Sequence, residues 1–79
     1  MPRYYFHIKD AQTTLDGQGT ELADVDAIRK EAVMIFRDVL RGDDPEAEFW
    51  SGATRWMLWV TDRPEGNGET LLTLQLSAG

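Results

Sequence analysis

Two segments of the chain alternate so that aromatic and aliphatic side chains fall on both sides of an extended strand. These segments are Arg3–Lys9 and Ala53–Thr61. Because successive side chains in a strand point to opposite faces, each face of the resulting sheet receives apolar residues. One face is expected to carry Tyr4, Phe6, Ile8, Trp56, Leu58 and Val60, and the other Tyr5, His7, Met57 and Trp59.

A single amphipathic helix is predicted between these two strands. Asp24 is a suitable N-cap, because its carboxylate can accept hydrogen bonds from the free N–H groups of the first turn. Gly42 is the expected end of the helix. Apolar residues recur in between at steps of three and four, namely Val25, Ile28, Ala32, Ile35, Phe36, Val39 and Leu40. Because one helix buries only one face of the sheet, the other face must contact a partner, a second copy of the chain, or water.

The remaining segments predict two hairpins. The first strand is followed by a possible turn and a short strand, Thr13–Leu15, after which Asp16–Gly19 interrupts regular structure with two glycines. A last strand, Thr70–Leu76, follows the pair Asn67-Gly68, which is a strong hairpin signal. The predicted fold is α+β, in the order β-β-α-β-β, with a small antiparallel sheet and one helix packed on one face.

Length and composition narrow the class of protein. The chain has 79 residues, which fits a single domain over residues 1–79, and it has no cysteine for disulfides or thiolate metal sites. Eight basic and fourteen acidic side chains give a net charge of −6, which argues against a general binder of polyanions. No segment approaches the roughly 18 apolar residues of a membrane-spanning helix. We expect a cytoplasmic domain whose modest core is supplemented by self-association.

Candidate chemistry is sparse. His7 is the only histidine and could serve in acid–base chemistry or as a pH switch. Because it has no second histidine, no cysteine and no carboxylate nearby in sequence, we interpret it as a half-exposed strand residue with local hydrogen bonds. The acidic segment Asp43–Glu48 is interpreted as solvated, with its specific role left open. We predict no catalytic residue, no metal ligand and no cofactor.

The side of the sheet opposite the helix, here called the far face, is the strongest candidate for a functional surface. Its candidate interface residues are Arg3, Tyr5, His7, Arg55, Met57 and Trp59, with Lys9 and Leu71 beside them. The three long strand candidates contain no Asp or Glu, so this face is expected to be locally basic and aromatic. We consider three occupants in this order: a second copy of the chain, the Phe49–Trp50 segment folded back over the face, and a single-stranded nucleic acid stacked on the rings.

We therefore predict a non-enzymatic binding or interaction module that forms a homodimer through the far face. The alternative is a nucleic-acid-binding or regulatory module that uses the same face, such as an acidic antitoxin-like protein that neutralises a basic partner. Both hypotheses depend on strand register, because a bulge in either long strand would exchange the two sets of side chains.

Three stretches of the chain carry a distinctive combination of residues. They are Met1–His7, Asp16–Asp24, and Val60–Asp62 with Leu71–Leu74. Together they resemble a family of short bacterial proteins of unknown function that begin Met-Pro-Arg-Tyr-(Tyr/Phe)-Phe-His and carry Asp-x-x-Gly-x-Glu-Leu-x-Asp before an Ala-rich helix. This chain departs from that pattern in lacking a glycine in the first turn and in carrying two tryptophans in its third strand. The resemblance implies a small standalone domain and assigns no site.

Overall fold

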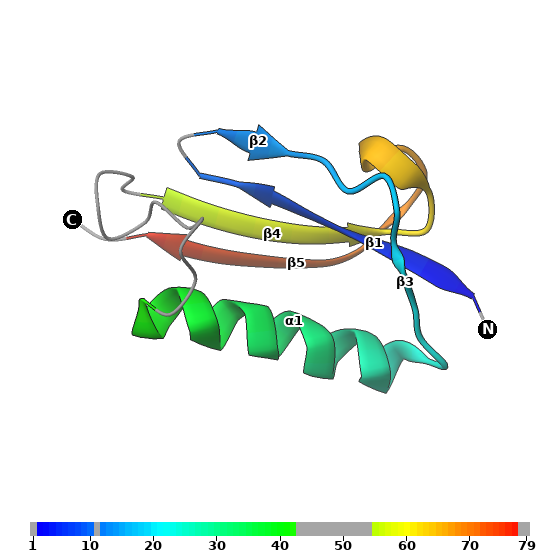
Figure 1. Cartoon of the computed structure of the whole chain (residues 1–79), viewed down its shortest axis with the longest axis horizontal. Coiled ribbons are helices and arrows are strands. Elements are labelled where there is room, and N and C mark those ends of the chain that lie inside the picture. The colour runs from blue at the N-terminus through cyan, green and yellow to red at the C-terminus, as the bar shows by residue number, and fades with distance from the viewer. Residues whose placement is uncertain (1, 11, 43–54, 78–79) are drawn as a thin grey trace.

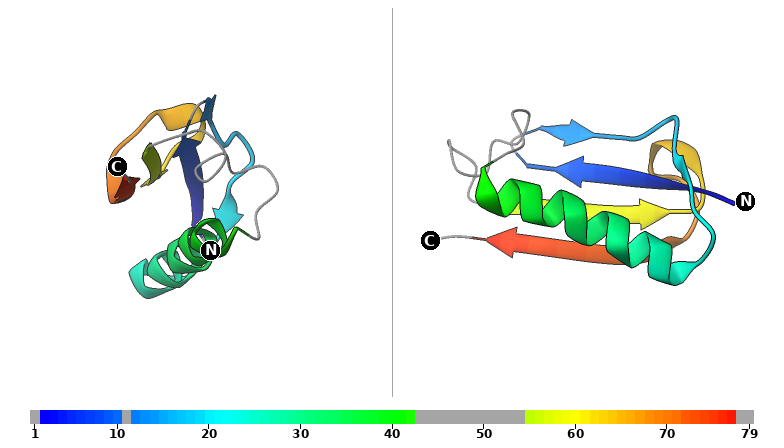
Figure 2. Two further views of the ribbon diagram at one scale, coloured as in Figure 1. Left: turned by 90° about the vertical axis from the view of Figure 1, so that its left-hand side faces the viewer. Right: turned by 60° about the horizontal axis from the view of Figure 1, so that its bottom comes forward.

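The computed structural model of the protein describes residues 2–10, 12–42 and 55–77. These residues form one α-helix, five strands and a short 3₁₀ turn (Figure 1). In chain order the elements are β1 (Arg3–Lys9), β2 (Thr13–Thr14), β3 (Thr20–Glu21), α1 (Val25–Arg41), β4 (Arg55–Thr61), η1 (Pro64–Gly66) and β5 (Thr70–Ser77). All strand pairs are antiparallel, and α1 lies along one side of the sheet (Figure 2). The predicted α+β class is therefore confirmed.

The sheet has the order β2-β1-β4-β5, and β3 also pairs with β1. On the edge of β1 opposite β4, Ile8 pairs with Thr14 and Tyr4 pairs with Thr20. The strand β3 was not predicted, because two residues are too few to show an alternating pattern. It forms because the chain returns to β1 after the interruption at Asp16–Gly19.

The helix begins and ends where the sequence predicts. The Asp24 carboxylate accepts a hydrogen bond of 2.9 Å from the Ala27 backbone N–H, and Gly42 ends the helix with a φ of 74°. Two residues of the predicted apolar stripe are nevertheless exposed, Val25 at 61% and Leu40 at 42%. Val25 is the first helical residue, and Leu40 is rotated about 100° from the buried Val39, so both lie beside the packed stripe.

The core lies between α1 and the face of the sheet that the alternation predicts. Its buried members are Ile28, Ala32, Val39, Trp56, Leu58 and Val60. Tyr4, Phe6 and Ile8 pack against them from β1, and Leu72, Leu74 and Leu76 from β5. The rings of Phe36 and Trp56 stack with centroids 5.6 Å apart. The predicted inner face is thus confirmed.

The predicted hairpin between the last two strands is also confirmed, since β4 pairs with β5. Its connection is longer than a two-residue turn and contains η1, with positive φ at Glu65, Gly66 and Gly68. A bulge occurs where Val60 pairs with Leu72 and Thr61 pairs with Thr70. Because the additional residue, Leu71, belongs to β5, the alternation of β4 is unchanged and the two faces are not exchanged. The beginning of the predicted third strand, Asp43–Glu48 and Phe49–Trp50 lie outside the described residues.

The N-cap generates a stability prediction. Replacing Asp24 with Ala removes the acceptor for the Ala27 N–H, and we expect the free energy of unfolding to fall by about 1 kcal/mol. Urea denaturation followed by circular dichroism measures this change. Asp26→Ala is the matched control, because Asp26 is exposed in the first turn and only contributes an exposed ion pair with Arg29. Equal effects of the two substitutions would contradict a capping role for Asp24.

Candidate interaction face

The far face is built from the strand positions that alternate with the core residues. Since Trp56, Leu58 and Val60 point toward α1, the intervening residues of β4 point away from it, and the same holds for β1. The far face therefore carries Tyr5, His7, Met57, Trp59 and Thr61. Cross-strand pairing adds Thr73 beside Trp59 and Gln75 beside Met57.

His7 differs from its sequence-based interpretation, because its side chain is 0% exposed. Its Nδ1 atom accepts a 2.9 Å hydrogen bond from the backbone N–H of Asp16. The imidazole proton must therefore sit on Nε2, which donates to Thr61 Oγ1 at 2.8 Å. The Thr61 hydroxyl, also 0% exposed, in turn donates to the Arg63 carbonyl at 2.6 Å. The local hydrogen bonds were expected, but the half-exposed position was wrong, since the ring is covered.

This chain of hydrogen bonds is complete only for the neutral ring. Burial lowers the pKa of His7, and the nearby negative charge of Asp16 opposes this effect only partly. A protonated ring would carry N–H on both nitrogens and would point one of them at the Asp16 N–H. His7 is therefore held neutral by its position in the fold, and it does not itself reach the surface of the far face.

Asp16 is the residue that the sequence analysis missed. Its Oδ2 atom accepts from the Phe6 N–H at 3.1 Å, and its Oδ1 atom accepts from the N–H groups of Gln18 and Gly19, each at 3.0 Å. Burial of the carboxyl raises its pKa, but these backbone donors, with a contribution from His7, outweigh burial and lower the pKa overall. The available signal was an Asp directly before a Gly-x-Gly turn, a position where its side chain often bonds backbone N–H groups ahead of it.

The segment Leu15–Gly19, here called the strap, covers one end of the far face. The Asp16 carbonyl accepts a 2.9 Å hydrogen bond from the Glu65 N–H, which joins the strap to η1. Gly19 lies so close to β1 that a Cβ atom there would be 2.7 Å from the Tyr5 ring and 2.6 Å from Arg3 Cγ. The strap and η1 thus cover the end of the face that contains Tyr5, His7 and Thr61. Phe49–Trp50, the segment of the chain predicted as a possible cover of this face, lies outside the described residues.

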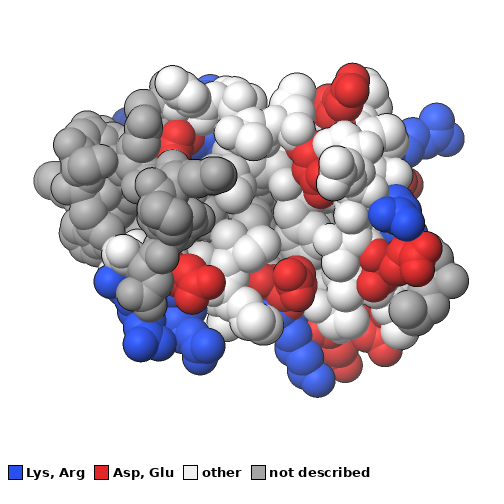
Figure 3. Space-filling model, in the orientation of Figure 1, with Lys and Arg blue, Asp and Glu red and all other residues white. Residues whose placement is uncertain are grey.

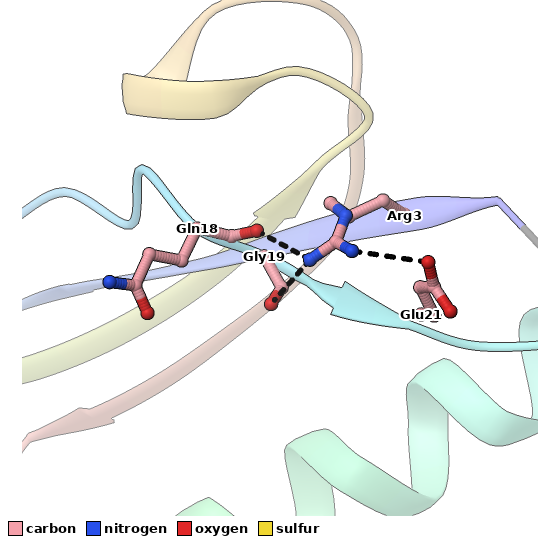
Figure 4. Close-up of polar contacts among 4 residues, drawn as sticks. All are labelled: Arg3, Gln18, Gly19 and Glu21. Atoms are coloured by element: carbon pink, nitrogen blue, oxygen red, sulfur yellow. Dashed lines mark hydrogen bonds and ion pairs between the residues drawn. The ribbon is translucent and has the colours of Figure 1, made fainter.

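Arg3 fastens the end of the strap and does not form a free basic rim (Figure 4). Its Nη1 atom donates to the Gln18 carbonyl at 2.8 Å and to the Gly19 carbonyl at 3.4 Å. Its Nη2 atom donates to Glu21 Oε1 at 3.1 Å in an ion pair whose side chains are about half exposed. The guanidinium therefore bonds to the chain on both sides of the turn at Gly19. Arg3 is thus a structural residue of β1 that holds the strap against the sheet.

The part of the face that the strap leaves uncovered is centred on β4 and β5. Met57 and Trp59 are partly exposed there, Thr73 and Gln75 are exposed, and Arg55 is exposed at the end of β4. We call these five residues the open part of the far face. Trp59 also contacts the buried histidine, with ring centroids 5.2 Å apart, and Gln75 lies 3.8 Å from the Met57 sulfur. Of the predicted interface residues, Arg55, Met57 and Trp59 lie together in the open part of the far face. Tyr5 and His7 lie at the end that the strap covers, where His7 still contacts Trp59, and Arg3 bonds the strap.

Two further observations concern the described part of the chain. Among residues 2–10, 12–42 and 55–77, no group of three or more His, Cys, Asp or Glu side chains is arranged to hold a metal ion. Within the same residues, no helix has the length and apolar character needed to cross a membrane.

Comparison with known proteins gives one match. A family model described as a domain of unknown function (DUF6894) matches residues 3–77. No curated protein and no solved structure matches the chain. The match covers nearly the whole chain and confirms the resemblance to a family of short proteins of unknown function.

The close approach of the strap generates a prediction at Gly19. Gly19→Ala should reduce the free energy of unfolding by more than the roughly 1 kcal/mol expected for an Ala at positive φ, because its Cβ would also push the strap away from Tyr5. Gly42→Ala is the matched control, since Gly42 has the same φ of 74° and no neighbouring atom among the described residues lies within 4 Å of the added Cβ. Chemical denaturation of both variants measures the difference. Equal losses of stability would show that the strap does not press on Tyr5.

Proposed function

The chain belongs to the DUF6894 family, a domain of unknown function, and we propose that it is an interaction module that self-associates through the open part of the far face. The observation that carries this proposal is the incomplete cover of the sheet. The helix α1 covers one face, and the strap and η1 cover one end of the other. Met57 and Trp59 remain partly exposed beyond that cover. Large apolar side chains on an accessible surface of a small domain favour an interface.

Charge favours a second copy of the chain as the occupant. In a two-fold contact each residue near the axis meets its own counterpart, so a charged centre repels itself. Met57, Trp59, Thr73 and Gln75 are uncharged, and β5 contains no charged residue along Thr70–Ser77. With a net charge of −6 distributed elsewhere on the chain and Arg55 at the end of β4, two copies can meet through these four uncharged side chains without like-charge repulsion at the centre of the contact.

The exposed apolar residues of α1 form a weaker candidate. These residues are Val25, Val33, Met34 and Leu40. The two central ones, Val33 and Met34, point about 100° apart around the helix, and Lys30 and Arg37 lie among the four. Figure 3 shows acidic and basic side chains interspersed over the side of the molecule that it displays. Isolated apolar residues among charges are common on protein surfaces and favour no particular partner.

The alternative of a nucleic-acid-binding or regulatory module loses support from the position of Arg3. Its guanidinium bonds Gln18, Gly19 and Glu21, so the basic groups left on the far face are Arg55, within the open part, and Lys9 beside it. Two cations on a chain with a net charge of −6 provide little attraction for phosphates. This alternative predicts salt-dependent binding of single strands that weakens on Arg55→Glu, and absence of binding at low salt would exclude it.

Self-association is tested by the solution mass of the protein. We expect light scattering at micromolar concentration to give the mass of a dimer for the wild type and of a monomer for Trp59→Asp, because the Asp introduces a charge at the centre of the contact. Met34→Asp is the matched control on the outer side of α1 and should remain dimeric. A monomeric wild type, or a Trp59→Asp variant that stays dimeric, contradicts the proposal.

A second variant separates loss of contact from loss of folding, because Trp59 also packs on His7. Gln75 is exposed, and its side-chain amide donates a long hydrogen bond to the Met57 sulfur. Gln75→Lys should weaken the dimer by at least tenfold in dissociation constant while the helical circular dichroism signal is unchanged. An unchanged dissociation constant would place the contact elsewhere.

A further inference from the structure

We propose that His7 is an acid-sensitive latch, and that protonation of its ring releases the strap, Leu15–Gly19, from the far face while the rest of the fold stays intact. The proposal concerns the attachment of the strap to the sheet. It holds whether or not the chain self-associates, because every contact on which it depends lies within one copy.

The latch consists of one hydrogen bond between the strap and the ring, and its donor and acceptor are fixed. The Asp16 N–H points at Nδ1 of His7 from 2.9 Å, and the opposite nitrogen already donates to Thr61. The ring has no room to exchange these roles, because the Thr61 hydroxyl uses its own proton to bond the Arg63 carbonyl. A proton added to Nδ1 therefore faces the Asp16 N–H, donor against donor, at a ring that is fully buried beside a partly buried backbone N–H.

The elements packed around the ring carry several charged residues. They are Asp16 in the strap, Arg63 and Glu65 in the connection after β4, and Arg3, Lys9 and Arg55 on the far-face side of the two long strands. Asp16 is the charge that raises the pKa of His7, but burial lowers it by more. Because backbone donors lower the pKa of Asp16 itself, its carboxylate stays ionised throughout the range in which histidine titrates.

The sign of the pH dependence follows from these shifts. With the strap closed, the pKa of His7 lies below its ordinary value of 6.5, and with the strap released the ring meets water and recovers that value. The released form therefore binds more protons between the two values, so acid favours release. The ratio of released to closed strap rises by up to about tenfold for each pH unit below 6.5, until the pKa of the closed form is reached.

Release is local because the strap and the core lie on opposite sides of the sheet. The six buried core residues are on the α1 side, and none belongs to the strap, β2, β3 or η1. The strap is flanked by strands of only two residues each, and no residue of η1 is buried. Losing the strap therefore leaves the packing of α1 against β1, β4 and β5 unchanged.

Nuclear magnetic resonance of the ¹⁵N-labelled full chain tests the latch. At about pH 7.5 we expect the ring nitrogens to report the neutral form with the proton on Nε2. As the pH falls to about 5, the amide signals of Asp16, Gly17, Gln18 and Gly19 should shift with the same midpoint as His7, below 6.5, while ellipticity at about 222 nm stays constant. The proposal would be overturned if the amide shifts of the strap did not change with the titration of His7. It would also be overturned if helical ellipticity fell with the same midpoint.

Two variants that do not titrate separate the latch from a general effect of acid. Asn at position 7 places an amide oxygen where Nδ1 lies, so His7→Asn should keep the strap closed and remove its response between about pH 7.5 and 5. Gln reaches Thr61 with its amide nitrogen but leaves the Asp16 N–H without its acceptor. His7→Gln should therefore show a loosened strap at every pH. A pH response of the strap that persists in His7→Asn would assign the effect to another group.

Discussion

The Asp16 carboxylate accepts a hydrogen bond from β1 at a position where no neighbouring strand pairs with that edge. The arrangement of the far face depends on this hydrogen bond. On the outer edge of β1, pairing with β2 ends at Thr14 and pairing with β3 begins at Thr20. Between them the Phe6 N–H would have no partner from a neighbouring strand, and Asp16 Oδ2 accepts its hydrogen bond. Since an unpaired buried N–H costs about as much as a lost hydrogen bond, the strap can leave the plane of the sheet only because Asp16 holds this position.

Leaving that plane brings the strap over the side chains of β1. The Asp16 N–H then reaches His7, its carbonyl reaches Glu65, and Gly19 lies against Tyr5. Each contact joins residues that are far apart in sequence, so the strap is fixed by several elements at once. The result divides the far face into a covered end around His7 and an open part around Met57 and Trp59. Because His7 accepts the hydrogen bond from the strap at this boundary, protonation of its ring is coupled to whether the strap covers the face.

The regular elements of this fold were predictable because their signals are local. Alternation in Arg3–Lys9 and in the described part of the third strand identified the inner and outer side chains correctly, since the period of a strand is two residues. The caps of α1 at Asp24 and Gly42 were equally readable, because capping depends on residue type and on backbone groups within one turn. The exposure of Val25 and Leu40 was not predictable from the sequence. Which residues at the margin of an apolar helix stripe become buried depends on the elements that pack beside them.

The sequence by itself determined the α+β class, the two faces of the sheet, the limits of the helix and the family resemblance, because each depends on short-range patterns along the chain. Only the tertiary structure decided that His7 is buried, that Arg3 bonds the strap, and which part of the far face stays open. His7 and Asp16 are nine residues apart, and His7 and Thr61 are 54 apart. No periodicity connects such positions; they meet because strand pairing and the detour of the strap bring them together, and only then do burial and hydrogen bonding set the protonation of the ring.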